Sequence, residues 1–302
     1  MSAPRCRALP PDEVAAVFLA ACRAELDALK PGNVHVHAGG HGMGTAHFMA
    51  AAEAAAPFVA DAGLKPGARI LGAVAASMRA AGCNTNLGIV LLSVPLAVAA
   101  GLDRPDTSLR DRVGEVLAGL DAADAADVYA AIRIANPGGL GRSEEADVAA
   151  PPTVSLLEAM RLAAPRDRIA AAYANGFRDI FEDHLGVLAA ARKRVASTPG
   201  AVDSDAVTTL HMSLLARFPD SHIRRKLGFE VAAHVQALAK ATRHAWTALA
   251  TSAAHAELLR LDSLLKSEGW NPGTTADFVV ATLLAADLEQ RMRLNPLSKV
   301  LS

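Results

Sequence analysis

The sequence is poor in features that direct a chain to an oxidising compartment or to nucleic acid. Its 302 residues contain 3 cysteines, and none of them belongs to a CxxC pair. Such a set favours neither a disulfide framework nor a thiolate zinc site. The formal net charge is −1, so no long-range field attracts nucleic acid or an anionic membrane. These absences indicate a reducing compartment and only local recognition of phosphate.

Long hydrophobic runs are missing as well. The most apolar stretch, residues 89–100, is shorter than the ~20 residues that a membrane span needs, and Pro95 lies in its middle. The first residues, MSAPRCRALPPDEV, lack the apolar stretch of a signal peptide. We therefore expect a cytoplasmic protein with neither a membrane nor a nucleic-acid partner.

Three common catalytic motifs are also absent. The chain contains no GxxxxGK[ST] loop, no GxGxxG after a strand-like segment and no GxSxG elbow. This disfavours the familiar nucleotide-binding and hydrolase folds.

What the chain does have is helical periodicity. Hydrophobic residues make up 52% of the sequence, and in alanine-rich segments they recur at spacings of three and four. Strand-like alternation of β-branched residues is almost absent. We therefore predict an all-α fold, built as one large, bundle-like domain over residues 1–302. A subdivision near 136–152, the longest irregular stretch, is the alternative. Helices are expected, the longer ones broken, over residues 12–29, 46–61, 67–81, 87–100, 108–119, 122–135, 154–163, 166–197, 204–217, 229–266 and 274–293.

The first loop, residues 30–47, concentrates polar side chains. It holds Lys30, Asn33 and four of the 10 histidines, His35, His37, His41 and His47. Imidazoles can ligate a transition metal, but no carboxylate in the loop completes a familiar site. Near neutral pH they can also act as a general base or donate to phosphate. A solvated surface loop is the third interpretation.

Two further loops open apolar helices in similar ways. The first, GCNTNLG over 82–88, contains Asn84, Thr85, Asn86 and Gly88, and the second, NPGTTAD over 271–277, contains Asn271, Gly273, Thr274 and Thr275. Helix starts of this kind bind anions, although the same residues also serve as simple caps. Asp277 would lie one turn into the second helix, where a carboxylate can hold magnesium or pair with the helix dipole.

Two charged clusters complete the candidates. Arg224, Arg225 and Lys226 form a small cationic group suited to a polyphosphate, or else a solvated face. Asp179, Glu182 and Asp183 recur at helical spacing after Asn-Gly, which is compatible with magnesium or with an exposed acidic face.

Five segments together resemble the triphosphoribosyl-dephospho-CoA synthase family in order and context. They are KPGNVHVHAGGHGM (30–43), GCNTNLGIVLL (82–92), YANGFRDIFE (173–182), DSHIRRKLG (220–228) and NPGTTADFVVATLLA (271–285). The resemblance covers roughly residues 15–290. It implies an all-α fold and a reaction in which the 2′-hydroxyl of 3′-dephospho-CoA displaces adenine from ATP. ATP and a small-molecule hydroxyl acceptor are then the partners, Mg²⁺ accompanies ATP, and a homodimer is left open.

Mapped onto this chain, the family's chemistry suggests roles for the candidates. The two helix starts, with Asn33, would cradle phosphates, helped by Lys30, Arg224, Arg225 and Lys226. His35 or His41 is the candidate base. Asp179, Glu182 and Asp277 are the candidate carboxylates for magnesium or for the positive charge that builds on the ribose, with Asp220 behind them.

The loop over residues 31–43 departs from the members that are specific for dephospho-CoA. Those members read PGLVD and then a GAHxDM-like stretch, whereas this chain reads PGNVH and then GHGM. The PGNV and GCNTNLG variants look more like a branch found in archaea and in methanopterin-using bacteria. An alternative acceptor is therefore a ribitol or sugar hydroxyl in tetrahydromethanopterin-type cofactor biosynthesis. An ATP-dependent kinase or hydrolase and a non-enzymatic helical nucleotide-binding module remain alternatives of other classes.

Overall fold

The computed structural model describes residues 6–40, 42–139, 147–247 and 251–293. Within these ranges the chain forms 15 α-helices, one short π-helix and no strand, which confirms the all-α prediction. The π-helix, η1, covers Ile180–His184. The α-helices are α1 Pro11–Asp27, α2 Thr45–Ala60, α3 Pro66–Ala81, α4 Leu87–Gly101, α5 Leu109–Ala118, α6 Ala122–Ala135, α7 Leu156–Ala163, α8 Arg168–Ala174, α9 Leu185–Ala196, α10 Asp203–Arg217, α11 Ser221–Leu227, α12 Phe229–Ala241, α13 Arg243–Thr247, α14 Ser252–Ser267 and α15 Gly273–Met292.

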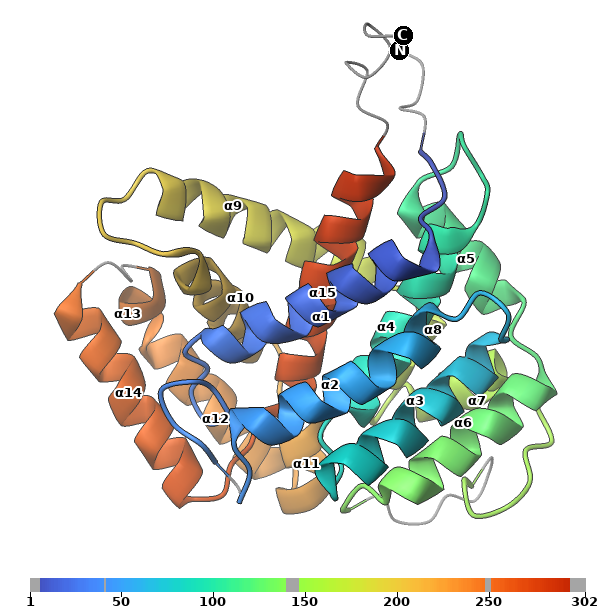
Figure 1. Cartoon of the computed structure of the whole chain (residues 1–302). Helices are drawn as coiled ribbons and strands as arrows, with labels where there is room; N and C mark the ends of the chain where they lie inside the picture. The colour runs from blue at the N-terminus through green and yellow to red at the C-terminus, as the bar shows by residue number, and fades with distance from the viewer. Residues whose placement is uncertain (1–5, 41, 140–146, 248–250, 294–302) are drawn as a thin grey trace, which may run out of the picture.

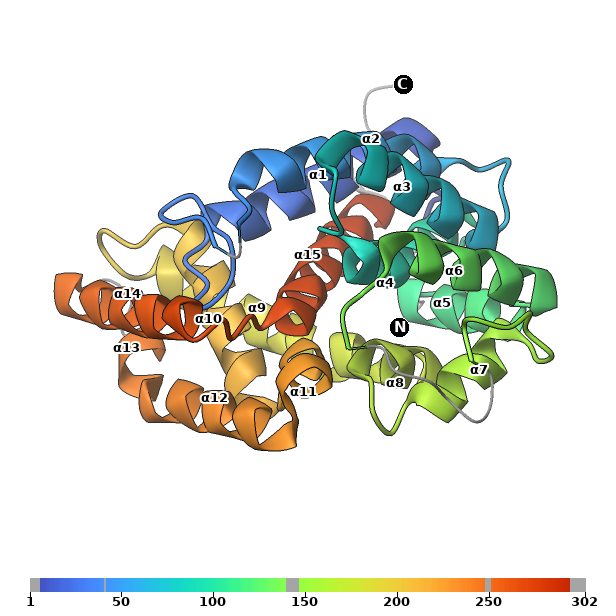
Figure 2. The same cartoon turned by 90° about the horizontal axis from the view of Figure 1, so that it is seen from below.

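The molecule is organised around α15, which crosses its middle (Figures 1 and 2). Helices α3, α6 and α7 lie on one side of it, and α12, α13 and α14 lie on the other. Both α15 and its neighbour α4 are apolar around most of their circumference, with nearly every residue of α4 buried. A helix that is hydrophobic on all sides has to be surrounded by protein, so these two form the centre of the fold.

The core separates into two clusters of buried side chains. The larger one surrounds α4 and α15 and includes Phe18, Leu92 and Phe278. The smaller one lies between α10, α12 and α14 and includes Val235 and Leu258. Helix α10 contributes to both clusters, so it joins them. The single domain and the subdivision near 136–152 both stay predictions, and residues 140–146 lie outside the described part.

One helix was not predicted from the sequence. The segment 220–228 was treated only as a cationic cluster, but it forms α11. Asp220 accepts hydrogen bonds from the backbone N–H groups of His222 (2.8 Å) and Ile223 (3.1 Å), as an N-cap does, and Gly228 follows the last turn. The long helix expected over 166–197 breaks at Gly176 and Phe177, both with positive φ, before η1 and α9.

None of the helices in the described residues combines the length and the apolar character that crossing a membrane requires.

Candidate active site

A cavity of about 720 Å³ lies where α4, α6, α7, α8, α11 and α15 converge. Its volume is within the range of ~300–1,000 Å³ that is usual for small-molecule sites. Residues of α6, α7 and α8, including Val128, Ile132, Leu156, Met160 and Ile169, form the apolar half of its lining. The polar half of its lining comes mainly from other elements. Predicted site residues that line it are Asn33, Asn84, Thr85, Gly88, Arg224, Arg225, Lys226, Asn271, Gly273, Thr274 and Asp277.

The start of α4 forms one wall of the polar half. The side-chain oxygen of Asn84 accepts from the Leu87 N–H at 3.3 Å. Thr85 Oγ1 is buried and has no hydrogen-bond partner within the described ranges. A buried hydroxyl that faces a cavity without a partner is costly unless a ligand or water satisfies it, so Thr85 is suited to contact a ligand. Asn86 instead donates from Nδ2 to Ser77 Oγ at 2.9 Å and does not line the cavity.

The start of α15 forms the facing wall. Gly273 and Thr274 line the cavity, whereas Thr275 is turned toward Asp220. One carboxylate oxygen of Asp220 accepts from the Thr275 N–H at 2.7 Å and from its hydroxyl at 2.8 Å. Because Asp220 also caps α11, this carboxylate fixes the starts of α11 and α15 relative to each other. Thr275 and Asp220 are therefore positioning residues behind the wall.

Asp277 lies where the two helix starts meet. A Cβ added to Gly88 of α4 would lie 2.0 Å from Asp277 Oδ2, so only glycine leaves room for this carboxyl. Burial raises the pKa of Asp277 well above its usual range, repulsion by Asp220 and Glu25 adds to the shift, and Arg225 partly opposes it. A carboxyl in this environment favours its protonated form.

The end of α11 brings cations to the cavity. Arg225 donates from Nε to the Gly138 carbonyl at 3.0 Å, and its Nη1 lies 3.6 Å from Asp167 Oδ2. Arg224 donates to the Pro165 carbonyl at 3.3 Å. These bonds hold both guanidinium groups at the wall, next to Lys226. Two helix starts and three cations thus face one space, which is an arrangement that suits a polyphosphate.

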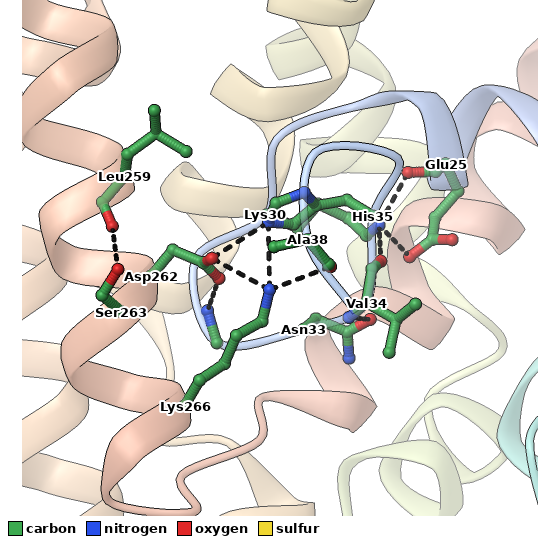
Figure 3. A network of polar contacts seen from close by, with 11 residues as sticks. Glu25, Lys30, Asn33, Val34, His35, Ala38, Leu259, Asp262, Ser263 and Lys266 are labelled. Atoms are coloured by element: carbon green, nitrogen blue, oxygen red, sulfur yellow. Dashed lines mark hydrogen bonds and ion pairs between the residues drawn. The ribbon is translucent and has the colours of Figure 1, made fainter. Parts of the chain in front are cut away.

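The loop after α1 does not supply the residues that the sequence suggested. Lys30 is fully buried, and its Nζ donates to the carbonyls of Glu25 (2.8 Å) and Val34 (2.6 Å) and pairs with Glu25 Oε1 at 3.1 Å (Figure 3). It therefore cannot reach a phosphate, and the prediction that it binds one has to be corrected. Asn33 does reach the cavity, where its Nδ2 donates to Asn271 Oδ1 at 2.8 Å.

His35 likewise stands outside the cavity. It is buried, and its Nε2 lies 3.3 Å from Asp262 Oδ2 and 3.3 Å from Lys266 Nζ on α14 (Figure 3). Asp262 also accepts from the Gly32 N–H at 2.9 Å, and Lys266 donates to the Ala38 carbonyl at 3.1 Å. This network ties the loop to α14, so the geometry gives His35 a structural role in place of the predicted catalytic one. His41, the other candidate base, lies outside the described residues.

Two predicted carboxylates are also directed elsewhere. Asp179 accepts from Arg168 and Asn175, both at 3.4 Å, while Glu182 is exposed and pairs with Arg110. Neither lines the cavity with Asp277. Among the described residues no three His, Cys, Asp or Glu side chains gather as a metal site would require. Asp179 and Glu182 therefore do not join Asp277 in one cluster of carboxylates, and the role of each in binding magnesium stays a prediction.

Glu25 of α1 was not among the site residues predicted from the sequence. It lines the cavity although it is only 3% exposed. Burial raises its pKa, and the adjacent Lys30 ammonium opposes that shift. The helical pattern could have predicted that Glu25 is buried. It continues the three- and four-residue spacing of the buried face of α1, after Phe18, Ala21 and Cys22. A carboxylate on such a face requires an explanation.

Comparisons with known proteins identify a family and a similar structure. The model of the family described as ATP:dephospho-CoA triphosphoribosyl transferase matches residues 11–296. A crystal structure from Archaeoglobus fulgidus, provisionally identified as a triphosphoribosyl-dephospho-CoA synthase, shares 26% identity with a TM-score of 0.58. The similarity covers 80% of this chain and 98% of that one. No curated protein matches the chain significantly.

Proposed function

The chain belongs to the ATP:dephospho-CoA triphosphoribosyl transferase family, and we propose that it transfers the triphosphoribosyl group of ATP to the 2′-hydroxyl of 3′-dephospho-CoA with release of adenine. The bond that breaks is the one between ribose and adenine, and the three phosphates stay on the transferred group. The site must therefore hold a triphosphate without activating its phosphorus atoms, and must stabilise positive charge on the sugar.

The observation that carries this proposal is that one cavity has both a polar and an apolar lining. The polar half combines the starts of α4 and α15 with Arg224, Arg225 and Lys226, which suits the triphosphate. The apolar half between α6, α7 and α8 suits a flat heteroaromatic base such as adenine. Asp277 lies between the starts of α4 and α15, next to Gly88. A ribose that bridges the two halves would then bring its glycosidic bond near this carboxyl.

Asp277 is suited to protonate the leaving adenine. Its raised pKa, with burial as the main cause, favours the protonated form of the carboxyl, which can donate a proton. A protonated carboxyl is a poor metal ligand. Mg²⁺ is therefore expected to arrive bound to the phosphates of ATP, where it neutralises their charge as part of the substrate.

The altered loop supports a second acceptor. Asn33 stands at the cavity wall and belongs to the PGNV segment, which resembles the branch found in archaea and in methanopterin-using bacteria. The alternative substrate is the hydroxyl of a ribitol or sugar in tetrahydromethanopterin-type cofactor biosynthesis. The chemistry at the ribose of ATP would be the same for both acceptors.

Incubation with ATP, Mg²⁺ and either acceptor, followed by chromatography of bases and nucleotides, tests the proposal. Free adenine together with an acceptor enlarged by a triphosphoribosyl group is the expected result. ADP or AMP would indicate a kinase or hydrolase instead. Absence of turnover and of any thermal shift with ATP would indicate a module that does not act on this nucleotide.

A further inference from the structure

Glu25 is the polar group in the cavity wall whose presence the fold explains least. Removing a carboxylate from water is costly, and a buried ion pair is often no more stable than apolar residues of the same volume. The fold nevertheless places Glu25 in the buried face of α1 and a fully buried Lys30 against it, with 3.1 Å between Nζ and Oε1. Stability alone therefore does not account for the pair.

The ammonium group of Lys30 contacts Glu25, and Lys30 does not itself line the cavity. Its ammonium group contacts the Glu25 carboxylate, the Glu25 carbonyl and the Val34 carbonyl, and these three contacts use its three N–H groups (Figure 3). The loop that carries Lys30 is in turn held to α14 through His35, Asp262 and Lys266. The ammonium is thus fixed behind the carboxylate, which alone of the two lines the cavity.

Burial raises the pKa of both Glu25 and Asp277, but the charges around the two carboxyl groups differ. The Lys30 ammonium, 3.1 Å from Glu25 Oε1, favours the ionised form of Glu25, whereas Asp220 and Glu25 disfavour the ionised form of Asp277. Other groups that interact with Glu25 include the Cys22 thiol one turn earlier on α1 and Asp277. One carboxyl group with a cationic partner and another with anionic neighbours are the arrangement expected of a base and an acid acting on one glycosidic bond.

We propose that Glu25 is the general base that takes the proton of the acceptor hydroxyl, and that Lys30 is the positioning residue that keeps Glu25 ionised. The inference rests on the proposed transfer from ATP. As the hydroxyl oxygen bonds to C1′ of the ribose, its proton passes to Glu25. The bond between C1′ and N9 breaks, its electron pair stays on adenine, and adenine takes a proton from Asp277. Glu25 then loses a proton to water and Asp277 regains one, so both return to their starting states.

The test compares Glu25→Gln and Lys30→Met with wild type in adenine release from ATP with dephospho-CoA, over pH 5 to 9. Glu25→Gln is expected to lower kcat by at least about 100-fold, the usual minimum for a general base. The KM for ATP should change by only a few-fold. Lys30→Met is expected to move the acid limb of the kcat/KM profile to higher pH, because the neighbouring carboxylate then lacks its counter-ion. Recovery of activity at high pH is a result that a merely structural role would not give.

A double variant guards against misfolding. Glu25→Gln with Lys30→Met leaves no unpaired buried charge, so it should fold, as circular dichroism can verify, and should remain as inactive as Glu25→Gln. Wild-type kcat in a folded Glu25→Gln or double variant would overturn the assignment of the base. A Lys30→Met variant that is slower at every pH, with the acid limb unmoved, would overturn the role of Lys30. If wild type itself releases no adenine with any acceptor, the proposed function fails and this assignment fails with it.

Discussion

Gly88 at the start of α4 and Asp277 in the first turns of α15 are in direct contact, so close that a Cβ on Gly88 would stand 2.0 Å from Asp277 Oδ2. The same Cβ would also meet Ile169 Cδ1 at 2.8 Å. Gly88 and Asp277, far apart in the sequence, thereby bring the starts of α4 and α15 together at the cavity. We therefore expect the activity to depend on a residue that carries no functional group.

Gly88→Ala should therefore impair catalysis more than folding. The new methyl group would displace the Asp277 carboxyl, and a misplacement of ~1 Å in a catalytic group costs roughly 100-fold in rate. Adenine release should fall by about that factor. The matched control is Gly114→Ala in α5, where an added Cβ meets nothing within 4 Å. It should keep full activity and gain about 0.5–1 kcal/mol of stability, because alanine favours a helix. Equal activities in the two variants would contradict the prediction.

Thr275→Val should destabilise the protein. The change removes the hydroxyl that donates to Asp220 Oδ2 at 2.8 Å and leaves a buried carboxyl oxygen with one hydrogen bond fewer. The expected loss is about 1–3 kcal/mol in the free energy of unfolding, measured by urea denaturation. Thr275→Ser retains the hydroxyl and is expected to recover most of that loss. If serine is no better than valine, the hydrogen bond to Asp220 does not matter for stability.

Lys226→Met should weaken ATP binding. Lys226 is exposed at the end of α11 and lines the polar half of the cavity. Losing one charge-assisted contact to phosphate, about 1.5–3 kcal/mol, predicts a KM for ATP that is roughly 10- to 100-fold higher. Thermal stability should hardly change. Lys240→Met, an exposed lysine on α12 away from this cavity, is the control and should leave KM unaltered. A similar KM in both variants would place the triphosphate elsewhere.

Glu182→Gln should leave turnover within about twofold of wild type. Glu182 is exposed and pairs with Arg110 outside the cavity, and exposed pairs contribute only about 0.2–1 kcal/mol to stability. Asp277→Asn should in contrast abolish most adenine release. Steady-state rates at several Mg²⁺ concentrations provide the measurement. If Glu182→Gln needed a higher Mg²⁺ concentration than wild type, the result would support the predicted role of Glu182 in binding magnesium.

Acid should destabilise the fold through His184. Burial lowers its pKa from 6.5 to about 3, and the nearby Arg168 and Arg217 guanidinium groups add to the shift against the opposing Asp183. Between these two pH values His184 is protonated in the unfolded state and neutral in the native state. The free energy of unfolding therefore falls as pH drops from about 6.5 toward about 3. The slope from this histidine reaches about 1.4 kcal/mol per pH unit.

His184→Leu isolates that contribution, because other buried groups titrate in both proteins. The free energy of unfolding of the variant should fall less steeply between pH 6 and 4 than that of wild type. Parallel slopes in the two proteins would show that His184 titrates normally in the native state.

The outline of the fold could be predicted from the sequence because helix boundaries are local. Pro66 at the start of α3, Gly82 after its end and Asn84, which accepts from the Leu87 N–H, each act within a few residues, so the helix ranges were readable. The order of motifs that resembles the family was readable as well, and the family model matches residues 11–296.

The composition of the site depended on contacts between distant residues, which periodicity does not encode. Lys30 and His35 are close in sequence to Asn33, which lines the cavity. His35 nevertheless pairs with Asp262 of α14, and Lys30 pairs with Glu25, so neither side chain lines the cavity. Glu25 itself had no local signal beyond its place on an apolar face. The sequence by itself determined most of the helices and the family, because those follow from local propensity and motif order. Only the tertiary structure decided which polar groups line the cavity, because burial and pairing with residues far along the chain set both their direction and their charge.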